Sequence, residues 1–89
     1  MEIILIFRTP GRGETARFRR HPAALTDREN RAQAKVIKAA GYKDSVNGWV
    51  SYAPGAAARI VAAFETAGYT VHLDGAVPVE LEPIAAQDN

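Results

Sequence analysis

The tripeptide Ala-Gly-Tyr occurs twice, at 40–42 and 67–69, and each copy joins a helix-like segment to a strand-like one. Glycine readily adopts the left-handed backbone that ends many helices, so Gly41 and Gly68 each predict a helix C-terminus. Two copies are too few for a repeat protein. They do impose an order on this part of the chain, in which helix and strand alternate.

The N-terminal segment predicts a β-hairpin. Residues 3–8 form an unbroken β-rich apolar run, which is typical of a strand covered on both faces. Pro10-Gly11 is a turn signal, and residues 15–19 then alternate small or apolar residues with arginine. These two strands are expected to pair, with a basic loop between them.

A capping box at Thr26 and Glu29 predicts the start of a helix that continues to about Ala40. Its inward side is predicted from helical spacing, and its basic residues fall on another side. The predicted inward residues are Ala32, Val36, Ala39 and Ala40.

A second hairpin is predicted from 42–46 and 49–52, because Asn47-Gly48 favours a type I′ turn. Pro54 suits the first turn of a second helix. The buried stripe predicted for that helix contains Ala57, Ile60, Val61, Phe64 and Ala67.

Residues 69–73 alternate as a strand, and 77–81 alternate again around Pro78, which predicts a last strand at a sheet edge. The predicted fold class is α+β: a mainly antiparallel sheet of five to six strands with two helices on one face, in the order ββαββαβ(β). We expect one domain over 1–82 and a frayed tail over 83–89.

With 89 residues, the chain has room for one hydrophobic core. It has no cysteine, which excludes disulfides, thiolate zinc sites and iron–sulfur clusters and fits a reducing compartment. The apolar run at 3–7 follows Glu2 and is too short for a secretory signal. We therefore expect a cytoplasmic protein with no membrane partner.

Charge is distributed unevenly. Residues 1–43 contain ten Lys and Arg against four Asp and Glu, for a net +6, whereas residues 44–89 carry a net −5. Such asymmetry indicates contact with nucleic acid or another polyanion. Arginine outnumbers lysine eight to three, which favours directed recognition of phosphate or carboxylate.

Residues with catalytic potential are few. His72 and Asp74 are two apart and Ser51 offers a hydroxyl, but nothing local brings them into contact as a triad. Glu80 and Glu82 are better explained by solubilising an edge strand than by binding a metal. The loop 10–15 lacks the lysine and spacing of a nucleotide-phosphate loop. We predict a non-enzymatic protein with no cofactor.

The candidate binding residues are basic side chains from the first hairpin, its loop and the first helix. If hairpin and helix lie side by side, they form one phosphate-binding surface. Aromatic residues that can stack on unpaired bases are Trp49, Tyr52, Tyr42 and Phe18. The basic residues are Arg8, Arg12, Arg17, Arg19, Arg20, Arg28, Arg31, Lys35 and Lys38.

Several segments of the chain carry a resemblance to a known family. They are the helix leading into Gly41-Tyr42, the segment 49–51, Pro54, and residues 60–64 leading to 67–71. Over residues 32–73 the chain resembles the HARP-type accessory domains attached to some annealing and phage-type helicases. The resemblance implies contact with DNA. The chain departs from that family in having its own N-terminal hairpin and no helicase motor, so a stand-alone version would act by binding.

Two functions are compatible with these features. The first is a nucleic-acid-binding domain that uses the basic surface. The second is a protein-interaction module, such as a phage-type inhibitor or adaptor, that binds an acidic surface of a larger machine. The opposite charges of the two halves also permit head-to-tail self-association.

Overall fold

The computed structural model describes residues 1–82. It contains five strands and two α-helices in the order ββαββαβ, followed by a short 3₁₀ helix. The strands lie in one sheet in the order β3-β4-β2-β1-β5, in which only the β1–β5 pair is parallel. The bounds are β1 Glu2–Arg8, β2 Ala16–Arg20, α1 Asp27–Ala39, β3 Lys43–Ser45, β4 Gly48–Ser51, α2 Ala56–Thr66, β5 Thr70–Gly75 and η1 Val79–Leu81.

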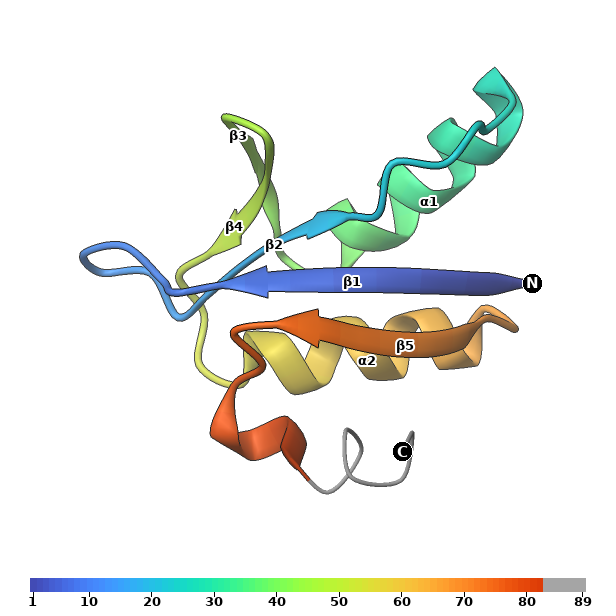
Figure 1. Ribbon diagram of the computed structural model, residues 1–89. Coiled ribbons are helices and arrows are strands. Elements are labelled where there is room, and N and C mark those ends of the chain that lie inside the picture. The colour runs from blue at the N-terminus through green and yellow to red at the C-terminus, as the bar shows by residue number, and fades with distance from the viewer. Residues whose placement is uncertain (83–89) are drawn as a thin grey trace.

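Both helices lie on one face of the sheet, as predicted (Figure 1). The core forms between them and alternate strand residues such as Leu5, Phe7 and Phe18, which are almost fully buried. The predicted stripe of α2 is largely confirmed, since Ala57, Ile60, Val61 and Phe64 are buried, but Ala67 is exposed.

The prediction that β1 is covered on both faces is wrong. Ile3, Leu5 and Phe7 belong to the core, whereas Ile4 and Ile6 point to the opposite face and are half-buried. The unbroken apolar run therefore marks an interior strand of the sheet, between β2 and β5, but not one that is covered on both faces. We call the side of the sheet away from the helices the open face.

Helix α1 begins as its sequence predicts. The Thr26 hydroxyl accepts a hydrogen bond from the Glu29 N–H (3.1 Å), and the Glu29 carboxylate accepts one from the Thr26 N–H (3.0 Å). The predicted inward side is confirmed in part: Ala40 is buried and Val36 packs against the core, but Ala32 and Ala39 are exposed. Gln33 and Ile37, which were not predicted to face inward, are buried. The buried side of α1 is therefore rotated by about one residue from the side predicted from the alanines.

The two Ala-Gly-Tyr segments end their helices in the same way. Gly41 and Gly68 have φ values of 91° and 93°. The N–H of Tyr42 donates to the carbonyl of Ile37 (3.3 Å), and that of Tyr69 donates to the carbonyl of Phe64 (2.9 Å). These are Schellman motifs, so the shared sequence does encode a shared helix stop.

The β3–β4 turn is placed differently from the prediction. Ser45 pairs with Gly48, which makes Val46 and Asn47 the central residues, and only Asn47 has a positive φ (59°). That is not a type I′ turn, which needs two positive φ values. Gly48 is needed for another reason: a Cβ there would collide with the carbonyl oxygen of Phe18.

The predicted last strand over 77–81 is also wrong. Residues Val79–Leu81 form the 3₁₀ helix η1, which packs against α2 and buries Leu81. Gly75, with φ 76°, turns the chain at the end of β5, and Pro78 has no N–H to offer a neighbouring strand. Pro54 does not lie in the first turn of α2 as predicted, because the helix begins at Ala56 with Gly55 as its N-cap. The predicted frayed tail, 83–89, lies outside the described residues.

Candidate functional site

A row of basic residues crosses the open face. Directly opposite residues of paired strands share a face, and the register aligns Arg8 with Arg17, Arg17 with Val50, and Val50 with Lys43. Val50 points to the open face and does not belong to the core, which lies on the helix side of the sheet. It is nevertheless only 5% exposed, so the long side chains beside it cover it. We call Arg8, Arg17 and Lys43 the basic row.

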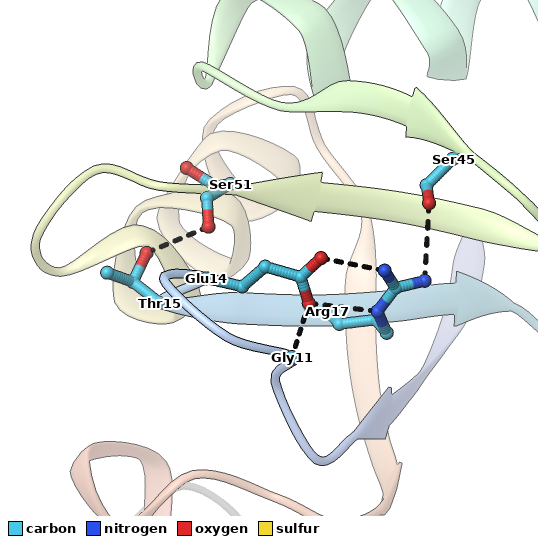
Figure 2. A network of polar contacts seen from close by, with 6 residues as sticks. All are labelled: Gly11, Glu14, Thr15, Arg17, Ser45 and Ser51. Atoms are coloured by element: carbon cyan, nitrogen blue, oxygen red, sulfur yellow. Dashed lines mark hydrogen bonds and ion pairs between the residues drawn. The ribbon is translucent and has the colours of Figure 1, made fainter.

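Arg17 is held in a defined geometry (Figure 2). Its Nε and Nη2 donate to the two carboxylate oxygens of Glu14 at 3.0 and 2.7 Å, and its Nη1 donates to Ser45 Oγ at 3.3 Å. Glu14 also accepts a hydrogen bond from the Gly11 N–H at 2.6 Å. The loop between β1 and β2 therefore folds back onto the sheet through one carboxylate.

The contact between Arg17 and Glu14 shifts the pKa of both side chains. The hydrogen bonds from Arg17, and after them the Gly11 N–H, hold the pKa of Glu14 below its ordinary value. The hydrogen bond to Glu14 raises the pKa of Arg17, and the nearby Tyr52 acts in the same direction. Arg17 and Glu14 are the only Lys or Arg and carboxylate within 4.0 Å of each other among residues 1–82.

Two of the three other arginines predicted in the first hairpin and its loop lie near this row. Arg19 is opposite Ile6 and shares the open face, and Arg12 is exposed in the β1–β2 loop. Arg20 takes the other face, where its Nη1 donates to Gln33 of α1 at 3.0 Å. Burial lowers the pKa of Arg20, and the charge of Asp44 opposes that effect.

The basic residues of α1 do not join them. Helix α1 packs on the face of the sheet that bears Leu5 and Phe18, so its exposed basic side chains and the basic row are on opposite sides of the sheet. The nine predicted residues therefore form two separate groups instead of one surface. Those of α1 are Arg28, Arg31, Lys35 and Lys38.

The predicted stacking aromatics are mostly in the core. Phe18, Tyr42 and Trp49 are 1%, 3% and 6% exposed, and Phe18 packs edge-to-face with Tyr42 at a centroid distance of 5.0 Å. Tyr52, directly after β4, is 57% exposed. It follows Val50 by two positions, which continues the alternation of β4 towards the open face.

Sequence reasoning missed one member of this site. Lys43 was not among the candidate binding residues, because it stands apart from the basic segments. Only the pairing of β3 with β4 and of β4 with β2 aligns it with Arg17. The Asn47-Gly48 turn signal predicted a strand at 42–46 paired with 49–52, but it gave no indication that this hairpin would pair with β2.

The catalytic candidates are dispersed. His72 Nε2 lies 2.6 Å from a Glu2 carboxylate oxygen on the open face, whereas Ser51 Oγ accepts a hydrogen bond from the Ala53 N–H. Asp74 accepts from the N–H of Gly75. Within residues 1–82 no cluster of three or more His, Asp and Glu side chains has the arrangement of a metal site. In that same part of the chain, none of the helices has the length and apolar character needed to cross a bilayer.

Comparison of the chain with protein-family models, with curated proteins and with solved structures finds no match.

Proposed function

We propose that this protein binds single-stranded nucleic acid across the open face of its sheet, without catalysing a reaction. The observation that carries the proposal is the alignment of Arg8, Arg17 and Lys43 across four adjacent strands. Strands lie about 4.8 Å apart, so Arg8 and Arg17 are on neighbouring strands and Lys43 lies two strands beyond Arg17, with Val50 between them, in one line that a phosphate backbone can follow. Arg19 flanks the track on the same face.

The remaining character of the open face favours a single strand over a duplex. Ile4 and Ile6 provide half-exposed apolar surface, and Tyr52 provides an exposed ring. Unpaired bases stack on such groups, whereas the bases of a duplex are already stacked on each other. The open face of the sheet also offers no helix to enter a major groove from this side.

Fluorescence polarisation with single- and double-stranded oligonucleotides tests this function. Binding should be tighter for the single strand and should weaken steeply with salt, as counterions are released. The double variant R8Q/K43Q should reduce the slope of log K against log salt by about two and weaken binding more than tenfold.

The matched control is the triple variant R31Q/K35Q/K38Q on α1. It removes more positive charge than the sheet variant but from the opposite side of the molecule. It should bind the single strand with nearly unchanged affinity. Loss of binding in the helix variant and retention in the sheet variant would refute the proposed surface, as would the absence of salt-dependent binding in the parent protein.

A second candidate function uses the helix side. Among residues 1–82, Arg28, Arg31, Lys35 and Lys38 are exposed and lack a carboxylate within 4.0 Å. Beside them α1 and α2 form a shallow groove of about 450 Å³ with an apolar floor that includes Val36, Ala40 and Ala63. An acidic protein surface fits this combination. The triple α1 variant should then lose binding to poly-glutamate while it keeps its affinity for oligonucleotides.

The opposite net charges of the two halves of the chain also support head-to-tail self-association. Size-exclusion chromatography at low and high salt tests it, since an association between charged surfaces should dissociate as salt rises.

A further inference from the structure

A cleft of about 500 Å³ opens at the end of β2 beside the tip of the β3–β4 hairpin. The pairing of β2 with β4 stops at Phe18 and Trp49, whereas β2 continues beside β1 as far as Arg20. Figure 1 shows the hairpin tip turning away from the end of β2. The cleft lies between the hairpin tip and the end of β2.

Three arginines and one carboxylate line this cleft. Arg8, Arg19 and Arg20 contribute a charge of +3 and Asp44 contributes −1, which leaves +2. A phosphate monoester carries between −1.5 and −2 at pH 7, whereas a phosphodiester within a strand carries −1. The charge of the cleft is therefore matched to a terminal phosphate.

Arg19 supplies the strongest indication of a missing partner. Its Nε is buried and has no hydrogen bond among residues 1–82. A buried polar group without a partner costs about 1–3 kcal/mol, and more when it is charged. The planar guanidinium presents pairs of N–H groups that match two oxygens of one phosphate. Arg19 lines the cleft, so an anion there contacts the exposed part of its guanidinium, while the Nε itself stays covered by protein atoms.

The hairpin contributes neutral hydrogen-bonding groups. Ser45 Oγ accepts a hydrogen bond from Arg17, so its own hydrogen is available to donate. Asn47, at the turn, adds two amide donors at the cleft wall. Both residues lie within a short, well-defined hairpin, so they are positioned before a ligand arrives.

We propose that this cleft binds a phosphate monoester, carried by the end of a nucleic-acid strand or by a free nucleotide. The inference rests on the proposed function, because it makes the cleft the end of the track along the open face. It adds that the protein distinguishes phosphorylated from hydroxyl ends. Arg8 belongs to both surfaces, whereas Arg20 and Asn47 belong only to the cleft and Lys43 only to the row.

The test compares oligonucleotides of one sequence, labelled internally, that end in a 5′-phosphate, a 3′-phosphate or hydroxyls only. One phosphorylated form should bind about tenfold more tightly than the hydroxyl form at pH 7.5. The ratio should fall towards one at pH 5, because the second pKa of the phosphate is about 6.

The variants separate the cleft from the row. R19Q should abolish the preference for a phosphorylated end, and N47G should reduce it. Glycine accepts the positive φ of Asn47, so N47G removes the amide donors without strain. K43Q should weaken all three oligonucleotides equally and leave their ratio unchanged. Thermal unfolding of each variant establishes that it is folded, and N47G carries the test if R19Q is not.

Competition with AMP and with inorganic phosphate identifies the source of the phosphate. Displacement of the phosphorylated strand by AMP at micromolar concentration indicates a nucleotide site, and displacement only by other phosphorylated strands indicates a strand end. Equal affinity for all three oligonucleotides, with no binding of AMP, overturns the cleft inference and leaves the proposed function intact. Binding of AMP without binding of any oligonucleotide overturns the proposed function and leaves the cleft as a site for a free nucleotide.

Discussion

Arg8 and Arg17 lie directly opposite each other in the β1–β2 pair, and only Arg17 is paired with a carboxylate. Like charges at directly opposite positions destabilise a sheet. Glu14 offsets the charge of Arg17 and fixes its guanidinium, while Arg8 stays exposed and free of any carboxylate partner within residues 1–82. The basic row thus combines an oriented arginine with an unpaired one.

Replacement of Glu14 by glutamine should strengthen nucleic-acid binding. The variant removes the charge that neutralises Arg17 and leaves an amide oxygen that can still accept from the Gly11 N–H. Affinity for a single strand should rise severalfold, with a salt slope steeper by about one. Fluorescence polarisation measures both. E65Q is the matched control, because it makes the same change at an exposed position of α2, and an equal gain there would contradict the explanation.

Acid should weaken the start of α1. The hydrogen bonds between Glu29 and Thr26 hold the pKa of Glu29 below its ordinary value of 4.5. A group with a depressed folded-state pKa contributes stability above the unfolded pKa and loses it as pH falls through the folded one. The loss should therefore begin near pH 4.5 and grow below it. Urea unfolding between pH 3 and pH 7 measures it.

Glutamine at position 29 provides the control for the acid effect. It can complete the same capping box without a titrating group. E29Q should be less sensitive to acid than the parent protein, with similar stability at pH 7. An identical acid dependence in both proteins would assign the effect to other carboxylates.

Gly48 should tolerate no side chain. A Cβ there would overlap the backbone carbonyl of Phe18, which cannot move without disturbing the β2–β4 pair. G48A should cost about 1–3 kcal/mol in the free energy of unfolding, measured by urea denaturation. At Gly41, alanine has open space and suffers only from the positive φ, for a cost near 1 kcal/mol. The reverse order of the two variants would contradict the proposed contact.

The two ends of η1 should respond differently to truncation. Leu81 is 1% exposed, whereas Val79 is 77% exposed. L81A should destabilise the protein by about 2–5 kcal/mol, because it leaves a cavity in the core. V79A should change stability by less than about 0.5 kcal/mol. If 77–81 were the edge strand that its alternation suggests, Val79 and Leu81 would face the same way and respond alike.

Local signals in the sequence determined the helices and most strands. The capping box at Thr26 and the glycines after each helix act through bonds within a few residues, so they operate regardless of the rest of the fold. The order of elements followed from these signals. Where local pattern was ambiguous, as over 77–81, the prediction failed, because a strand needs a partner and Pro78 and Gly75 direct the chain away from one.

Tertiary structure decided the candidate site. Charge along the chain indicated a basic first half, but the two sides of a sheet separate residues that sequence places close together: Arg19 and Arg20 are neighbours and point to opposite faces. Strand pairing, in turn, aligns Lys43 with Arg17 across twenty-six positions of sequence. The pairing of strands that are distant in sequence depends on the packing of the whole chain, which no local pattern encodes.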